Sequence, residues 1–269
     1  MNDVVSTLHG RVRGGGEDGI HTFKGIPYAA PPFGANRLQP PRPLAAWSGV
    51  REALTYGPTP PQLTLSPPFD VIAPSVPGED CLNLNIWSSD LGSAGQSVMV
   101  WIPGGAFEAG GAVAYDGSRF ARDGVVCVTI NYRVGADGFL ALGDGVANLG
   151  LLDQIAALEW VQQNIAAFGG DPGNVTIFGE SAGASSIGML LSMPRAEGLF
   201  HRAIAQSPVF GTADQVMSAA TAQAVGRRLA EKLGVDATRD ARATMRFDTA
   251  SEVELDPRSA ERAVWDGVR

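Results

Sequence analysis

Residues 168–183, with the sequence FGGDPGNVTIFGESAG, constrain the fold of this chain more than any other stretch. Residues 175–178 form a short run of β-branched and aromatic side chains, which is typical of a buried strand. The sequence GESAG follows at once, and the small apolar residues 184–191 then favour a helix packed against a sheet. A strand, a G-x-S-x-G turn and a helix, in this order, form the context of a nucleophile elbow.

Ser181 is the residue that such a turn holds clear of the sheet, at the N-terminus of the following helix. Backbone N–H groups and the helix dipole favour negative charge there, and an ester carbonyl under attack develops such a charge. Gly179 and Gly183 leave room where side chains would collide. The alternative is a structural turn, because glycine and serine are common loop residues. The strand-to-helix setting favours the nucleophile.

A second glycine-rich stretch follows another predicted strand. Residues 98–102 form a continuous apolar run, which is typical of an interior strand of a parallel sheet, and Pro103, Gly104 and Gly105 come directly after it. Small residues after a strand let backbone N–H groups approach a ligand closely, as an oxyanion loop requires. An ordinary glycine-rich turn is the alternative.

Several motifs together make the chain resemble the type-B carboxylesterases, the cholinesterase-like esterases and lipases of the α/β-hydrolase superfamily. Residues 168–183 are similar to the family's active-site signature at every defined position, and residues 79–86 to its second signature. Other similar stretches occur in the family's order, at residues 23–29, 131–135, 148–154 and 200–207. The resemblance covers roughly residues 10–235.

The resemblance implies an α/β-hydrolase fold with a mostly parallel, doubly covered sheet, and hydrolysis of a carboxylic ester through an acyl-enzyme intermediate. By the same resemblance Ser181 is the acyl-forming nucleophile, and Gly105, Ala106 and Ala182 donate the N–H groups of the oxyanion hole. Many family members have His or Tyr where this chain has Pro103. Because the family's donors lie further along the loop, we expect the oxyanion hole to survive with a stiffer entry.

Two ion pairs are also implied by the resemblance. Arg37 with Glu79, and Arg133 with Asp153, occupy positions where the family has structural ion pairs. We expect both pairs to be at least partly buried and to join loops to the sheet.

The acid and the histidine of a catalytic triad are not found in this chain. In α/β-hydrolases the triad follows the chain order serine, acid, histidine. After Ser181 the sequence has one histidine, His201, and one acid before it, Glu197. We interpret His201, His9 and His21 as surface or structural residues. Since family members are roughly twice as long, the resemblance implies that the strands carrying the acid and the histidine lie beyond residue 269.

The net charge, the cysteines and the missing motifs restrict which partners, cofactors and cellular locations this chain can have. A net charge of −8 argues against a nucleic-acid partner, and no apolar run approaches the length of a membrane span. The first ten residues lack the pattern of a signal peptide. Cys81 and Cys127 are two isolated cysteines of core type, which predicts a fold without disulfides and a cytoplasmic location. The sequence has no motif for a metal or a nucleotide, so no cofactor is expected.

We expect one α/β-hydrolase domain over residues 1–235 and a divergent polar tail at 236–269, either weakly structured or forming surface helices. A β-rich segment reaches about Trp47 and is followed by a proline-rich loop. Strands are predicted at 82–87, 98–102, 125–131, 175–178 and 202–206. Helices are predicted at 153–168, with residues 155, 158, 161, 165 and 168 on one buried stripe, and at 213–233, with residues 216, 220, 225, 229 and 233 inward.

Without further strands, residues 202–206 form a sheet edge, and an apolar edge favours association. Three functional hypotheses remain. The first is a carboxylic ester hydrolase, present as a truncated or partial chain that acts on a small-molecule ester. The second is a catalytically impaired remnant or a binding module; family members of that kind have generally lost the serine, whereas Ser181 is present here. The third is a thioesterase or amidase that uses the same acyl-transfer site.

Overall fold

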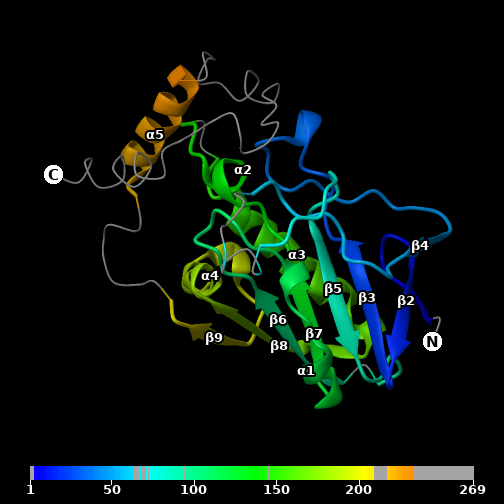
Figure 1. Cartoon of the computed structure of the whole chain (residues 1–269). Coiled ribbons are helices and arrows are strands. Elements are labelled where there is room, and N and C mark those ends of the chain that lie inside the picture. Colours follow the sequence, from blue (N-terminus) through cyan, green and yellow to red (C-terminus); the bar gives the residue numbers. More distant parts are fainter. Residues whose placement is uncertain are drawn as a thin grey trace.

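The computed structural model describes residues 3–62, 67, 71, 73–93, 95–143, 146–208 and 217–232. In this part of the chain a nine-stranded sheet carries helices on both faces (Figure 1). Its strands are β1 (Asp3–Ser6), β2 (Arg11–Glu17), β3 (Ile20–Pro27), β4 (Val50–Glu52), β5 (Asn83–Ser88), β6 (Gln96–Ile102), β7 (Val126–Ile130), β8 (Gly170–Glu180) and β9 (Arg202–Gln206). The α-helices are α1 (Ser118–Arg122), α2 (Gly135–Phe139), α3 (Leu149–Asn164), α4 (Ala182–Leu190) and α5 (Ala219–Lys232).

The sheet is antiparallel in its first half and parallel in its second. Its order is β1-β2-β3-β5-β7-β6-β8-β9, with β4 paired to β2. Along this order the pairs from β1 to β7 are antiparallel, whereas β7, β6, β8 and β9 run parallel. Strand β4 runs parallel to β2. The expectation of a mostly parallel sheet therefore holds for the central strands and not for the N-terminal ones. Because parallel strands end at the same edge, the residues after β6 and β8 meet there.

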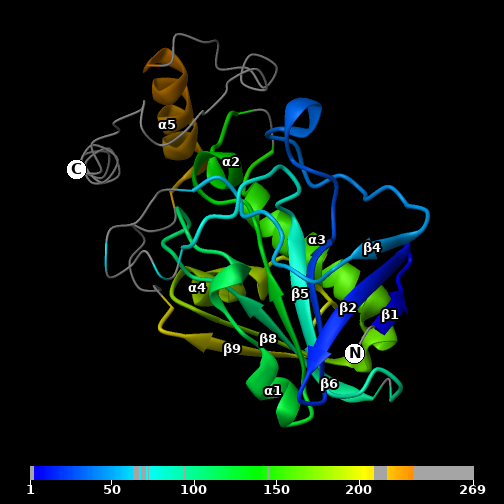
Figure 2. The same cartoon turned by 45° about the vertical axis from the view of Figure 1, so that its right-hand side comes forward.

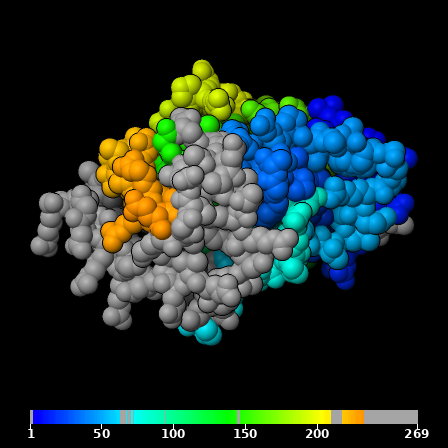
Figure 3. Space-filling view, turned by 90° about the horizontal axis from the view of Figure 1, so that it is seen from above, coloured from blue at the N-terminus to red at the C-terminus, as the bar shows by residue number. Residues whose placement is uncertain are grey.

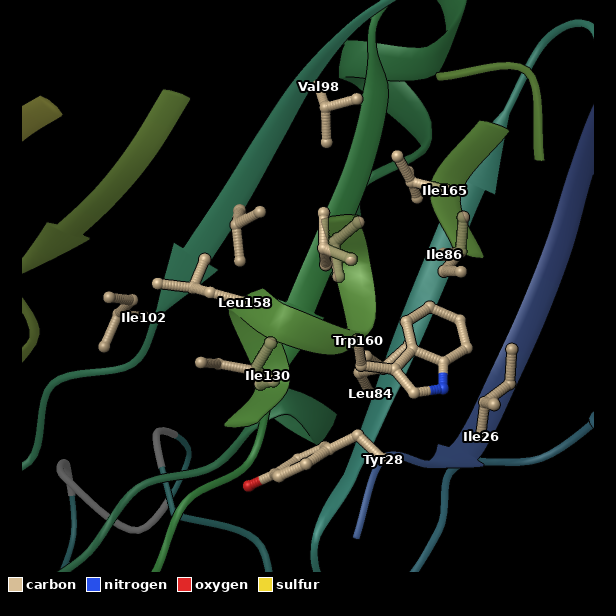
Figure 4. Packing of buried hydrophobic residues seen from close by; sticks show 14 of the residues in the cluster. Ile26, Tyr28, Leu84, Ile86, Val98, Ile102, Ile130, Leu158, Trp160 and Ile165 are labelled. Atoms are coloured by element: carbon tan, nitrogen blue, oxygen red, sulfur yellow. The ribbon is translucent and has the colours of Figure 1, made fainter. Parts of the chain in front are cut away.

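Helices α3 and α4 pack on one face of the sheet and α1 on the other (Figure 2). Alternation along β5 explains how one strand serves both layers, since successive side chains point to opposite faces. Leu84 and Ile86 join the main core, whereas Trp87 packs with Ile20 and Ala121 on the α1 face. The main core fills the space between the sheet and α3, as Figure 4 shows for Leu158 and its neighbours from the strands.

Most elements predicted from the sequence are present with shifted ends. The strand at 202–206 is confirmed as predicted, and the strand at 175–178 is part of the longer β8. Helix α3 begins at Leu149 and gives way to a 3₁₀ turn at Ile165–Phe168. The five residues of its predicted stripe are all buried.

The predicted inward face of α5 is correct in part, because Val225 and Leu229 are partly buried. Ala220 is exposed, and the buried residues of this helix are Gly226 and Ala230. A Cβ atom on Gly226 would lie 2.2 Å from the Ala141 carbonyl oxygen, so the glycine permits the close approach that turns this face inward. Residues 216 and 233 and the predicted tail at 236–269 lie outside the described residues.

Strand β9 is the last strand of the described sheet. All five of its residues are exposed, and Ile204 keeps 46% of its surface accessible. Seen from above, the N-terminal segments and α5 occupy opposite ends of the described molecule (Figure 3). In the described part of the chain, no helix combines the length and the apolar character that crossing a bilayer requires.

Candidate active site

Ser181 lies in the turn between β8 and α4. Its backbone has φ 53° and ψ −120°, a conformation that a residue with a side chain adopts only under strain. The turn is held on both sides, because the Ser181 N–H donates to the Gln206 carbonyl at 3.0 Å and the Ser185 N–H donates to the Ser181 carbonyl at 2.9 Å. Neighbouring hydrogen bonds therefore fix the strained backbone.

Two glycines let α4 approach the end of β6. A Cβ atom on Gly183 would lie 2.0 Å from the Ile102 carbonyl oxygen, and one on Gly179 would lie 2.7 Å from the same atom. Any side chain at Gly183 would push α4 away from the sheet. The G-x-S-x-G spacing thus reflects a steric requirement at both glycines.

The glycine-rich loop, which we define as residues 103–111, lies beside Ser181. A Cβ atom on Gly104 would be 3.3 Å from the Ser181 Cβ and 2.8 Å from the Glu180 carbonyl oxygen. Gly105, Ala106 and Phe107 all have positive φ, of 123°, 57° and 63°. Three consecutive residues of this kind give the loop a tight curl against the serine.

Neighbouring groups anchor this loop at several points. The Tyr132 hydroxyl donates to the Pro103 carbonyl at 2.7 Å, and burial raises the pKa of Tyr132 well above its ordinary value, so the donor keeps its proton. The Gly135 N–H donates to the Phe107 carbonyl at 2.6 Å. At the far end, the Gly110 N–H donates to Gln62 Oε1 at 2.6 Å.

The N–H groups of Gly105, Ala106 and Ala182 remain available at this edge of the sheet. Within the described residues, none of the three donates to an acceptor. Ala182 is the first residue of α4, where backbone N–H groups have no partner inside the helix. Available donors at a helix start and in an adjoining loop can bind an oxygen that gains negative charge.

The three histidines, all within the described residues, lie elsewhere. His201 directly precedes β9. Its N–H donates to the Val175 carbonyl at 2.8 Å, and its Nδ1 accepts from the Val175 N–H at 3.2 Å. Val175 and Ser181 are six residues apart on an extended strand, about 20 Å at about 3.3 Å per residue. His201 is therefore a strand-pairing residue.

His21 and His9 are also remote from Ser181. His21 Nδ1 lies 2.6 Å from Asp3 Oδ2, and His21 pairs with Ser88, at the edge where the parallel strands begin. His9 lines a cavity of about 320 Å³ over α3, with Arg42 and Trp160 among its other lining residues. His21 is therefore at the opposite edge of the sheet from the serine. His9 precedes β2, which lies five strand positions from β8, about 24 Å at about 4.8 Å per strand.

One of the two predicted ion pairs is present and the other has a different partner. Arg133 and Asp153 form a fully buried pair, with Nη2–Oδ1 at 2.7 Å and Nε–Oδ2 at 2.8 Å. The predicted pairing of Arg37 with Glu79 is wrong: among the described residues the ion pair of Arg37 is to Asp137 on α2, at 3.0 Å, and Glu79 is exposed.

Sequence reasoning missed Gln62, Tyr132 and Asp137. Tyr132 lies within the family-like stretch at 131–135, so its position was a usable signal, whereas Gln62 lies in a proline-rich loop without periodicity. In the described part of the chain, no group of three or more His, Cys, Asp or Glu residues is arranged to hold a metal ion.

Comparison with known proteins gives a consistent result. The family model "Carboxylesterase family" matches residues 1–258. The para-nitrobenzyl esterase of Bacillus subtilis (strain 168) is 47% identical over 235 residues, which are 83% of this chain and 47% of that protein. Liver carboxylesterase 1 of Oryctolagus cuniculus is 44% identical over 253 residues, 87% of this chain and 44% of that protein.

Solved structures agree with these sequence relatives. A Geobacillus stearothermophilus carboxylesterase superposes with a TM-score of 0.80 at 47% identity, over 90% of this chain and 51% of that one. A thermophilic PNB esterase reaches 0.84 at 40% identity, over 100% of this chain and 55% of that one. The fold is therefore the α/β-hydrolase fold, and the chain spans about half the length of the relatives it matches.

Proposed function

The chain belongs to the carboxylesterase family, and from this premise we propose that it acts on carboxylic esters, with Ser181 as the nucleophile. The proposal rests on one observation, the strained Ser181 turn between β8 and α4 with the glycine-rich loop beside it. A nucleophile at this point attacks the ester carbonyl carbon, and the carbonyl oxygen becomes an oxyanion.

The N–H groups of Gly105, Ala106 and Ala182 are the proposed donors to that oxyanion. Their support is that none has an acceptor within the described residues, and that Ala182 opens a helix of nine residues. The oxyanion then collapses, the C–O bond to the alcohol breaks, the alcohol leaves with a proton, and the acyl group stays on Ser181. Water later releases the acid and restores the serine hydroxyl.

The proposal assigns no acid and no histidine of the triad to this chain. The hydrogen bonds of His201 and the position of His21 leave neither at Ser181. A serine hydroxyl without an adjacent base is a weak nucleophile near neutral pH. We therefore assign binding of the carbonyl and formation of the acyl-enzyme to the described residues, and leave proton transfer unassigned.

Covalent labelling tests the nucleophile directly. A fluorophosphonate added to the 269-residue chain is expected to increase the mass of the peptide that contains Ser181, slowly because no base is adjacent. Ser181→Ala should abolish the labelling. Ser192→Ala is the matched control, because Ser192 is an exposed serine whose hydroxyl donates to the Met189 carbonyl. Equal labelling of the wild type and Ser181→Ala would contradict the proposal.

For partners, we propose a small carboxylic ester, and the net charge of −8 disfavours nucleic acid. The exposed β9 edge, with Ile204 on it, supports association of chains or segments by strand pairing. We also propose a cytoplasmic location. Its support is that Cys81 and Cys127 are both buried and neither forms a disulfide.

Thiol titration checks this cysteine assignment. Burial raises the pKa of Cys127 to about 12, and burial likewise raises the pKa of Cys81 well above its ordinary value. Since the thiolate is the reactive form, the native chain is expected to react very slowly with a disulfide reagent at pH 8. Reaction should accelerate as the pH approaches 12, where the stability due to the buried neutral thiols is lost. In denaturant two thiols should react per chain, and fewer than two would contradict a disulfide-free fold.

A further inference from the structure

The glycine-rich loop is curled so tightly that its two ends touch. A Cβ atom on Gly110 would lie 2.1 Å from the Gly104 carbonyl oxygen, and one on Gly105 would lie 2.1 Å from the Ala109 carbonyl oxygen. A shift of Gly110 is therefore passed directly to Gly104, which lies beside Ser181, and to Gly105, a proposed oxyanion donor.

Gln62 holds the distal end of this loop. Its Oε1 accepts from the Gly110 N–H at 2.6 Å, across 48 positions of sequence. The segment before Gln62 is itself anchored, because Asn83 Nδ2 donates to the Pro58 carbonyl at 2.8 Å and Asn131 Nδ2 donates to the same oxygen at 3.1 Å. Asn131 Oδ1 also accepts from the Ala112 N–H at 2.8 Å. Hydrogen bonds therefore fix the segment from which the Gln62 side chain reaches the loop.

The other half of the Gln62 amide has no comparable role. Its Nε2 is buried and has no hydrogen-bond partner within the described residues. An unpartnered buried amide is unfavourable, so packing alone does not account for a glutamine here. The hydrogen bond that Gln62 forms with the loop is accepted by its Oε1.

We propose that Gln62 is a positioning residue for the oxyanion loop: its side-chain carbonyl fixes Gly110 and thereby sets the direction of the Gly105 and Ala106 N–H groups. This inference rests on the proposed function and extends it to a residue outside the loop. Gln62 acts through the loop, so its loss is expected to affect the tetrahedral, charge-developing step more than the binding of an uncharged ester.

Two substitutions separate the parts of the amide. Gln62→Met keeps the length of the side chain and removes the acceptor. Gln62→Glu keeps an Oε1 acceptor, removes the unpartnered N–H₂ and adds a carboxylate charge. Gln162→Met is the matched control, because Gln162 is likewise a half-buried glutamine whose amide binds the backbone. Its Nε2 donates to the carbonyls of Pro172 and Leu199, at a site remote from Ser181.

Hydrogen–deuterium exchange and labelling together provide the test. In Gln62→Met, the peptide containing residues 104–110 is expected to exchange at least about tenfold faster, and fluorophosphonate labelling of Ser181 to slow by about 10- to 100-fold, the cost typical of a misplaced catalytic group. Gln62→Glu should restore the exchange of residues 104–110 to near the wild-type value, because the acceptor is kept. Gln162→Met should change neither, even if its melting temperature falls.

The outcomes distinguish this inference from the proposed function. Unchanged loop exchange in Gln62→Met, or loop exchange that rises equally in Gln62→Met and Gln62→Glu, would overturn the role of Gln62. If the wild type shows no labelling at Ser181, the proposed function fails, and the exchange of residues 104–110 in the two Gln62 variants still decides whether Gln62 holds the loop.

Discussion

The 269-residue chain is expected to hydrolyse p-nitrophenyl esters only about 10³–10⁴-fold faster than water. Oxyanion donors and substrate binding supply that much in serine hydrolases that have lost triad residues, whereas losing the histidine of another such enzyme reduces turnover by about 10⁶. We expect this chain to behave like those enzymes, because its three histidines form other contacts or line a surface distant from Ser181. Initial rates of the purified chain, measured against its Ser181→Ala variant, give the comparison.

His201→Ala distinguishes the possible explanations of a different result. His201 is bonded through Nδ1 to the Val175 N–H, so its replacement should cost a little stability and leave turnover unchanged. Fast turnover that His201→Ala abolishes would make His201 the base and overturn the proposed arrangement. Fast turnover that is indifferent to His201 would show that the proton is taken by a group elsewhere.

Breaking the Arg133–Asp153 pair is expected to lower the free energy of unfolding by about 3–5 kcal/mol. The side chains keep only 2% and 0% of their surface accessible, and Arg133 Nη1 also donates to the Gln39 carbonyl at 2.8 Å. Removing one partner by Arg133→Met or Asp153→Asn leaves the other buried without its counter-charge. Urea unfolding monitored by fluorescence measures the loss.

An exposed pair on α1 provides the control for this experiment. Arg119 and Asp123 form an i,i+4 pair with 79% and 60% of their side-chain surface accessible, and such pairs contribute about 0.3–0.5 kcal/mol. Arg119→Met should therefore change stability little. The double variant Arg133→Met/Asp153→Asn should lose less than the sum of its single variants, because both charges are gone. Equal losses in Arg133→Met and Arg119→Met would contradict a structural role for the buried pair.

Local patterns were sufficient to predict the backbone structure around Ser181. Ser181 lies after a strand and before a helix, as the run at 175–178 and the small residues after Gly183 indicate. The parallel pairing of β6 with β8 then brings the two glycine-rich segments to one edge of the sheet. Apolar runs identify such strands because both of their faces are buried.

Partners across long sequence separations were not predictable in the same way. The sequence identifies Arg37 as a paired residue, but its acid, Asp137, is 100 positions away on a short helix whose place depends on the whole fold. Gln62 is a similar case, since a single amide in a proline-rich loop carries no periodic signal. The antiparallel first half of the sheet likewise follows from tertiary pairing and not from strand composition.

The backbone of Ser181 sets a limit on how this protein can evolve. At φ 53° a glycine would fit with less strain than any residue with a Cβ atom, so selection for thermal tolerance alone favours replacing the proposed nucleophile. Selection for ester hydrolysis opposes that replacement at the same position. The proposed function therefore accounts for a serine in this conformation, and variants evolved only for heat resistance should lose it early.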